Sequence, residues 1–490
     1  MSRTPWEDEM SKRSYVLTFI VLLFLALSLS SADLDRDVQR GFDSIRAMDA
    51  YSYVRTMVEP RFAERHTRHE GYTAAARWAA GKFKQWGLKP IDKASGYLQP
   101  FPRPYVMVDQ AEMTLLSGNN DKETALKPET DFLPLLATDS GDHTASLVFV
   151  GWGVSAPDLG YDDYAGVDVR GKFVFCFRGL PDRRDDRFRP HDEHRHRMRT
   201  AQEKGALGLF YIYADPIANP NMDLIPGFTN AIISEKTADR ILSEIHVKSA
   251  DLRSDLQAYK RPISFSLESR MRYRVSSRHF PDGTGYNVVG WIEGTDPELK
   301  KECLVFGGHF DHCGEHIGIL FPGANDNASG SAAVMEIAEA FSRMRRRPKR
   351  SLVFVLFGGE EMGLQGSSYF VENVPAPFTR VDAMFNFDMV GEGDGVGCSV
   401  SPEPAGLKQA LQDSDIHVEA LRRVRDLRGP GGGSDYAPFH GQGIPCISCA
   451  SNGPHLHYHR SGDTIHRVNP DVMADTARLL FLTGWTWADR

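Results

Sequence analysis

The stretch SLVFVLFGGEEMG, residues 351–363, joins an apolar run to two adjacent glutamates. Six consecutive apolar residues, rich in β-branched and aromatic side chains and followed by glycines, are typical of a strand buried on both faces. Glu360 and Glu361 come directly after this run, where two bare carboxylates held side by side would repel each other. The stretch therefore predicts a buried strand of a parallel sheet, with charged chemistry at its end.

The surrounding sequence repeats this strand pattern and alternates it with helices. Three further apolar runs are predicted strands: YNVVGWIEG (286–294), ECLVFGGHF (302–310) and AMFNFDMVG (383–391). Between them, residues 329–347 have the spacing of an amphipathic helix, and residues 33–90 are also predicted to be helical. Strands that alternate with helices predict an α/β fold, with a mixed, mostly parallel sheet flanked by helices.

The composition is that of a globular protein without strong charge. The chain has 490 residues, and 57 Lys and Arg against 65 Asp and Glu give a net charge of −8. This mildly acidic balance argues against nucleic acid or anionic lipid as the main partner. Six cysteines in a chain of this length do not make a disulfide scaffold.

The N-terminus has the features of a targeting segment. Residues 15–29 form a charge-free apolar run that follows Lys12 and Arg13. The run is short for a membrane-spanning helix and fits a signal-peptide core, with an uncleaved N-terminal anchor as the alternative. Residues 1–32 are therefore predicted to direct export, to the periplasm or the medium, and any membrane contact is expected only through this segment.

The region before the α/β repeat has a different character. LVFVGWG (147–153) and GKFVFCFRG (171–179) are predicted strands in a compact β-rich module. The segment QEKGALGLFYIY (202–213) predicts a helix end followed by a strand. The basic, histidine-rich segment RPHDEHRHRMR (189–199) is predicted to be a solvated loop, because its arginines would oppose a bound cation.

Acidic and histidine residues follow the predicted strands, and they carry the functional signal. They are His309, Asp311, Asp326, Glu360, Glu361, Asp388 and, much later in the chain, His459. Because sites in open α/β sheets gather at the carboxyl ends of the strands, we expect these side chains to converge. Buried carboxylates need cations to offset their desolvation and repulsion. Imidazole and carboxylate donors without thiolate suit zinc, with cobalt or manganese as substitutes.

The spacing suggests two metal ions that share one carboxylate. We expect His309 with Glu361 at one ion, Asp388 with His459 at the other, and Asp326 between them. Such ions lie about 3.5–4 Å apart in co-catalytic hydrolases.

The remaining acids near this centre have supporting roles. Asp311 is positioned to accept the second N–H of the His309 ring and to fix its tautomer. Glu360 then stays free to handle protons.

The order of these motifs resembles the co-catalytic zinc aminopeptidases of peptidase family M28. The motifs are HxD, GAxDNASG, GEE, NxDMxG and YHxxxDT, with the first at His309 and the last at Tyr458 and His459. The resemblance implies a zinc-peptidase fold (phosphorylase/hydrolase-like), two Zn²⁺ per chain and Glu360 as the general base. It also implies that Tyr458 hydrogen-bonds the tetrahedral intermediate. The implied zinc ligands are His309, Asp326, Glu361, Asp388 and His459.

The resemblance also divides the chain. Residues 151–179 resemble part of the protease-associated (PA) domain that many members carry as an insertion. The expected division is a leader (1–32), the N-terminal part of the peptidase domain (33–130), an inserted PA domain (131–265) and the catalytic peptidase domain (266–490). The glycine-rich segment 429–445, with Tyr436, Phe439 and Ile444, is expected to line the pocket for the first side chain of the substrate.

The implied activity is removal of the N-terminal residue from peptides that have a free N-terminus. A carboxypeptidase of the same family, of the glutamate-carboxypeptidase type, is the first alternative. Those chains continue with a long helical domain, whereas 31 residues (490 − 459) follow His459. Glutaminyl cyclase would bind one zinc and would not need all five ligands, and an inactive receptor-like relative would have lost some of them.

Overall fold

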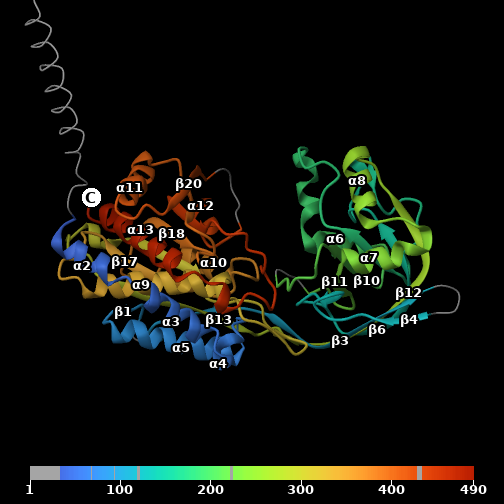
Figure 1. Ribbon diagram of the computed structural model, residues 1–490, viewed down its shortest axis with the longest axis horizontal. Helices are drawn as coiled ribbons and strands as arrows, with labels where there is room; N and C mark the ends of the chain where they lie inside the picture. Colours follow the sequence, from blue (N-terminus) through green and yellow to red (C-terminus); the bar gives the residue numbers. More distant parts are fainter. Residues whose placement is uncertain (1–33, 68, 93, 118–121, 221–223, 428–432) are drawn as a thin grey trace, which may run out of the picture.

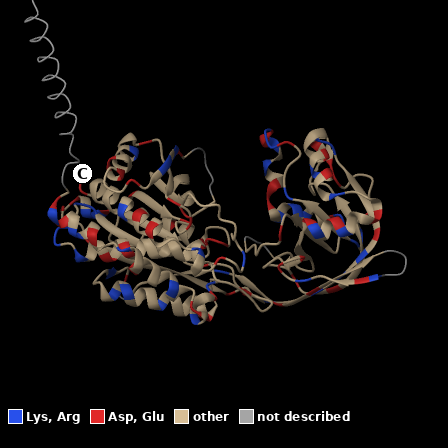
Figure 2. Ribbon diagram, in the orientation of Figure 1, with Lys and Arg blue, Asp and Glu red and all other residues tan. Residues whose placement is uncertain are grey.

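The computed structural model describes residues 34–490, apart from 68, 93, 118–121, 221–223 and 428–432. The described chain forms two bodies, each built around its own sheet (Figure 1). Basic and acidic residues are interspersed over both bodies in the view drawn (Figure 2). The predicted leader, 1–32, lies outside the described residues, so export remains a prediction.

We find no helix among the described residues that is both long and apolar enough to cross a membrane.

The first body contains a sheet in the order β1-β13-β17-β14-β18-β21-β19-β20, with β2 also paired to β13. Its centre is parallel, because β17, β14, β18 and β21 pair in the same direction. Antiparallel pairs flank this centre at β13–β17 and β19–β21, which confirms the mixed, mostly parallel sheet. The strands are β1 (Lys89–Pro90), β2 (Leu98–Pro102), β13 (Thr284–Ile292), β14 (Glu302–His309), β17 (Ser351–Phe357), β18 (Arg380–Phe387), β19 (Val396–Val400), β20 (Leu421–Asp426) and β21 (Cys446–Ser451).

Helices cover both faces of this sheet. Alternate residues of β14 point to opposite faces, so Phe306 packs with α9 and α13 while Val305 joins the cluster that contains α10 and α12. The predicted helical region before residue 90 forms α2 to α5. The helices are α2 (Arg36–Ser44), α3 (Ala47–Met57), α4 (Pro60–Ala63), α5 (Glu70–Gln85), α9 (Gly330–Arg343), α10 (Gln365–Glu372), α11 (Ala405–Asp415), α12 (Tyr436–Gly441) and α13 (Pro470–Ala488).

The second body contains a sheet in the order β4-β3-β12-β6-β9-β10-β11-β5. Two long strands, β3 and β12, run from the first body into the second and pair with each other (Figure 1). The elements are β3 (Tyr105–Ser117), β4 (Lys122–Ala125), β5 (Phe132–Pro134), β6 (Gly141–Val150), β9 (Phe173–Phe177), β10 (Gly208–Tyr213), β11 (Thr229–Ser234), β12 (Ser264–Phe280), α6 (His194–Glu203), α7 (Glu235–Leu242) and α8 (Ser249–Tyr259). Two small hairpins complete the chain: β7 (Ser155–Ala156) with β8 (Tyr161–Asp162), and β15 (Gly314–His316) with β16 (Ile319–Phe321).

The second sheet begins before residue 131 and ends after residue 265, the limits expected for the insertion. Both β3 and β4 lie in this sheet, although they were assigned by sequence to the N-terminal part of the peptidase domain. Each long strand passes between the bodies without a break in composition, so the sequence gives no sign of the boundary. The identity of the second body as a PA domain remains a prediction.

The prediction of a solvated loop at 189–199 is wrong. Most of this segment lies in the 3₁₀ turn Asp186–Asp192 and in helix α6. The Arg197 side chain is fully buried, and it donates a hydrogen bond of 2.8 Å to the carbonyl of Gly179. His194, Met198 and Ala201 share the buried face at helical spacing, a period that the dense charges obscured.

A buried acid in α9 makes the stability of the first body depend on pH. Glu336 is 2% exposed, and burial raises its pKa to about 8. This pKa lies above the value of about 4.3 in the unfolded chain. The free energy of unfolding should therefore fall as the pH rises from the unfolded pKa to the folded pKa, and it should level off at higher pH. From pH 6 to 9 we expect the wild type to lose about 2 kcal/mol more than Glu336→Gln, a few degrees in melting temperature. Calorimetry at these pH values measures both proteins. The same change in melting temperature for wild type and Glu336→Gln would contradict the prediction.

Candidate active site

The predicted site residues lie at the carboxyl ends of neighbouring parallel strands. His309 is the last residue of β14, Asp388 directly follows β18, and Glu360 and Glu361 follow β17. The other two come from loops: Asp326 precedes α9, and His459 follows β21. The sheet topology therefore brings six side chains from five segments to one edge, as the strand pattern predicted.

Asp326 lies between two histidine–carboxylate pairs. One of its oxygens, Oδ1, is 3.2 Å from His309 Nε2, and the same nitrogen is 3.4 Å from Asp388 Oδ1. The other oxygen, Oδ2, is 3.3 Å from His459 Nε2, which is 2.9 Å from Glu361 Oε2. A single buried carboxylate thus faces both pairs.

The pairing differs from the one expected from the sequence. His309 is paired with Asp388 rather than with Glu361, and Glu361 is paired with His459. Strand order permits either pairing, because β14 lies between β17 and β18. The side-chain distances place Asp388 nearest His309 and Glu361 nearest His459. Order along the chain carries no information about which neighbour each side chain meets.

The donor geometry fits bound metal ions. With zinc–ligand distances of about 2.0–2.1 Å, neighbouring ligands of a tetrahedral ion are separated by about 3.3 Å, close to all four distances above. Asp326 Oδ2 and His459 Nε2 are also buried without a hydrogen-bond partner. Burial opposes a charge on His459, but Glu361 and Asp326 outweigh it and raise its pKa to about 10. This electrostatic demand for positive charge is what a divalent cation satisfies.

The Asp311 carboxylate is not the group closest to the His309 ring. The His309 Nδ1 atom is 3.2 Å from the backbone oxygen of Asp311 but 3.9 Å from its carboxylate. That carboxylate instead accepts the backbone N–H of Glu360 at 3.2 Å. Asp311 therefore supports both residues, with its main chain facing the histidine and its side chain facing the glutamate loop.

Glu360 is placed beside the cluster rather than inside it. Its carboxylate lies within 4.8 Å of ligand atoms of His309 and Asp388, and the residue is only partly buried. Burial raises the pKa of Glu360 well above its usual value, and the neighbouring acids add to this effect. Glu360 also lines a cavity of about 470 Å³ that reaches Glu361 and His459. It is a carboxylate with access both to the cluster and to solvent.

Tyr458 lines the same cavity. Its ring stacks on His459 with centroids 3.8 Å apart, and the residue is 45% exposed. The side chain therefore lies at the cavity surface rather than in the core, and its role toward an intermediate remains a prediction.

The glycine-rich segment contributes less to the cavity than expected. Residues 428–432 lie outside the described part of the chain, and Gly433 lines the cavity. Phe439 is fully buried, and Tyr436 and Ile444 pack against the same core cluster. Phe439 is thus a core residue, whereas Tyr436 and Ile444 are partly buried, and none of the three lines the cavity. A pocket for the first side chain of the substrate in this segment remains a prediction.

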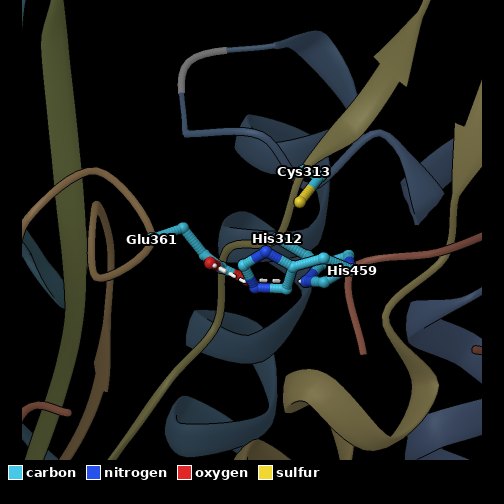
Figure 3. Close-up of side chains that lie close together, drawn as sticks. All are labelled: His312, Cys313, Glu361 and His459. Atoms are coloured by element: carbon cyan, nitrogen blue, oxygen red, sulfur yellow. Dashed lines mark hydrogen bonds and ion pairs between the residues drawn. The ribbon is translucent and has the colours of Figure 1, made fainter. Parts of the chain in front are cut away.

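A buried histidine that we did not select from the sequence supports one of the ligands. His312 Nδ1 lies 2.7 Å from Glu361 Oε1, while the other oxygen of Glu361 faces His459 (Figure 3). Cys313 completes this group, whose donor atoms lie within 4.8 Å of one another. The signal was present in the sequence, since HFDHCG contains a second histidine three positions after His309.

His312→Leu should weaken zinc binding at the Glu361–His459 pair by about 10- to 100-fold, because it removes the group that orients Glu361. His312→Asn is the matched control, since its side-chain amide can donate from near the Nδ1 position. Zinc affinity is measured by competition with a chromogenic chelator. Equal affinities for the two variants would show that His312 has no positioning role.

Two further buried residues hold the loops that carry the ligands. Asp463 accepts the backbone N–H groups of Asn325 and Asp326, both at 2.9 Å, and so fixes the entry to α9. Arg65 is fully buried and donates to the carbonyls of Phe310 and Gly323. Asp463 was visible in the YHxxxDT motif without a role, whereas nothing in the sequence singles out Arg65.

The second body also reaches the site. The His459 Nδ1 atom lies 2.7 Å from the carbonyl of Ala218, whose own N–H donates to the carbonyl of His459 at 2.9 Å. An ion pair of 3.0 Å between Asp215 and Arg460 joins the same two loops. The Ala218 carbonyl accepts the Nδ1 proton, which leaves Nε2 facing Asp326 and Glu361.

A mostly parallel α/β sheet that carries this buried imidazole–carboxylate cluster at its strand ends defines an α/β metallohydrolase. Residues 287–483 match the family model of peptidase family M28. Over these residues the chain is therefore similar to peptidase family M28.

Two relatives and one solved structure illustrate the similarity. Leupeptin-inactivating enzyme 1 of Streptomyces exfoliatus is 37% identical over 224 residues, which cover 41% of this chain and 48% of that protein. Aminopeptidase YwaD of Bacillus subtilis is 29% identical over 232 residues, covering 44% of this chain and 47% of that protein. The chain thus matches about half the length of these curated relatives. An aminopeptidase from Aneurinibacillus sp. strain AM-1 shares the fold over 92% of this chain and 96% of its own, at a TM-score of 0.64 and 19% identity.

Proposed function

We propose that this protein is a di-zinc aminopeptidase, which hydrolyses the first peptide bond of substrates with a free N-terminus. The observation that carries the proposal is the position of Asp326, with one carboxylate oxygen against each histidine–carboxylate pair. His309 and Asp388 would hold one ion, His459 and Glu361 the other, and Asp326 would contact both.

The chain's own residues account for the proton transfers. Bound zinc would supply a Lewis acid for the scissile carbonyl and lower the pKa of a water molecule. Glu360 would accept the proton of the attacking water and deliver it to the leaving amine. Its position beside His309 and Asp388, on the cavity wall, supports this role. Tyr458, on the same wall, is placed to donate a hydrogen bond to the developing oxyanion.

The free amine of the substrate has an acidic environment to bind. An ammonium group is attracted by the carboxylates that surround the histidine pairs, which favours an N-terminal residue at the metal side of the cavity. The second body lines the opposite wall, through Arg178 and Tyr213 among others. This enclosure supports short peptides as substrates, and an extended internal segment of a folded protein would not fit it.

The test uses the zinc-loaded full chain, leucine-p-nitroanilide and the tripeptide Leu-Gly-Gly. We expect release of leucine from both, dependence on metal after chelation, and two zinc ions per chain by elemental analysis. Glycine as the first product of the tripeptide would instead identify a carboxypeptidase. A single zinc with cyclisation of N-terminal glutamine would identify a glutaminyl cyclase, and zinc binding without turnover would identify an inactive relative.

A further inference from the structure

The cavity at the metal cluster is lined on its second-body side by an arginine and a histidine. Arg178 and His194, from the second body, line this cavity together with Glu360. The same Arg178 and His194, together with Gly363, also line an adjoining cavity of about 550 Å³, so the two spaces share these three residues. Both volumes lie in the range of small-ligand pockets.

The adjoining cavity contains a buried arginine without a partner. Arg103, between β2 and β3, is 7% exposed, and its Nε atom is buried without a hydrogen bond. Among the residues that the structure describes, none forms a hydrogen bond or ion pair with its guanidinium. Burial lowers the pKa of Arg103 to about 10, although the nearby Asp311 carboxylate opposes this shift without contacting the guanidinium, so the group is still charged at neutral pH. An unpaired buried charge is costly, and proteins normally satisfy it with an opposite charge.

Arg178 is also poorly neutralised. Its nearest carboxylate is Asp192, with Arg178 Nε 3.8 Å from Asp192 Oδ1, and its side chain is 41% exposed to the cavity and solvent. His194 does not contribute charge, because burial lowers its pKa to about 3. Both of its ring nitrogens are buried without partners, which leaves a neutral donor beside the arginines.

We propose that Arg103 and Arg178 form a subsite for a carboxylate of the peptide substrate, in the adjoining cavity that both arginines line. The inference rests on the proposed aminopeptidase function and names its substrate class: short peptides that carry a carboxylate beyond the scissile bond. Such a peptide complements the charges of the site. Its ammonium group would lie near the protein's carboxylates at the metal cluster, and its own carboxylate would lie near the two arginines. Guanidinium groups are suited to this task because their planar N–H donors match the geometry of a carboxylate.

The carboxylate has two possible sources, the C-terminus of a di- or tripeptide or an acidic side chain. The experiment therefore uses two substrate pairs with the zinc-loaded full chain: Leu-Gly against Leu-Gly-NH₂, and Leu-Glu-NH₂ against Leu-Gln-NH₂. For each pair we measure the ratio of kcat/KM values, carboxylate over neutral. The variants are Arg103→Met and Arg178→Met, and the second keeps the test open if the buried position does not tolerate methionine. The matched control is Arg274→Met, which removes an exposed arginine of β12 that is paired with Asp142.

We expect the wild type to favour a carboxylate substrate, and each of the two variants to lower that ratio by about 10- to 100-fold, the worth of a charge-assisted hydrogen bond. Arg274→Met should keep the wild-type ratio. A fall in the first pair assigns the subsite to the C-terminus, and a fall only in the second assigns it to a side chain. Ratios unchanged in both pairs overturn the inference.

Failure of the proposed function would look different. In that case the wild type would release no leucine from any substrate, including leucine-p-nitroanilide. The subsite is then judged by binding alone, from the calorimetric affinities of Leu-Gly and Leu-Gly-NH₂. A preference for Leu-Gly that Arg178→Met removes supports the subsite, and equal affinities overturn it.

Discussion

Glu360→Gln should keep the full zinc content and lose about 10²- to 10⁴-fold in kcat, the range that a general base contributes. The amide has nearly the same shape as the carboxylate, but it cannot accept the proton of the attacking water. Glu360 faces the cavity and belongs to neither histidine–carboxylate pair. Its replacement should therefore leave the proposed metal ligands intact. Steady-state kinetics with leucine-p-nitroanilide, alongside elemental analysis of the same samples, give the result.

The adjacent residue supplies the matched control. Glu361→Gln makes the same chemical change one position along the chain, but at a carboxylate 2.9 Å from His459 Nε2. We expect this variant to lose zinc as well as activity. If Glu360→Gln also loses zinc, or retains most of its turnover, Glu360 is not the base.

Asp326→Ala should have a larger effect on zinc content than Glu360→Gln. Because one carboxylate faces both pairs, its removal should lower the zinc content from two ions toward none and reduce kcat/KM by about 10³-fold or more. Zinc content after dialysis at a fixed free-zinc concentration, measured together with kcat/KM, tests this.

The comparison variant is Asp388→Ala, which removes a carboxylate that faces only His309. The Asp388→Ala variant should lose one zinc ion, and the Glu361–His459 pair should still bind the other. Two remaining ions in Asp326→Ala, or equal losses in both variants, would contradict the bridging position of Asp326.

The contact between the second body and His459 bears on how the catalytic site is assembled. Ala218 holds the ring from a loop 241 positions away, and it does so through its backbone carbonyl, so this contact does not depend on the type of side chain at position 218. Its arginines also line the cavity. The second body thus contributes to the candidate site through its contact with His459 and through residues that line the cavity.

The sequence by itself determined the class of fold and the members of the buried imidazole–carboxylate cluster. Apolar strands interrupted by one amphipathic helix require a parallel sheet covered on both faces, and acids that follow such strands must meet at one edge. His309, Asp326, Glu361, Asp388 and His459 were all found in this way. Their chemical types, buried beside apolar strands, were enough to indicate a cation.

The tertiary structure alone decided which ligands share a metal position and what surrounds them. Which acid lies nearest each histidine depends on how the loops at the strand ends pack, so His309 meets Asp388 while Glu361 meets His459. His459 donates to Ala218, which belongs to the second body and lies far away in the sequence. Arg103, whose Nε is buried without a hydrogen-bond partner, is likewise placed only by the tertiary fold. Contacts over such separations follow from packing, because a backbone carbonyl or a lone arginine has no pattern of its own in the sequence.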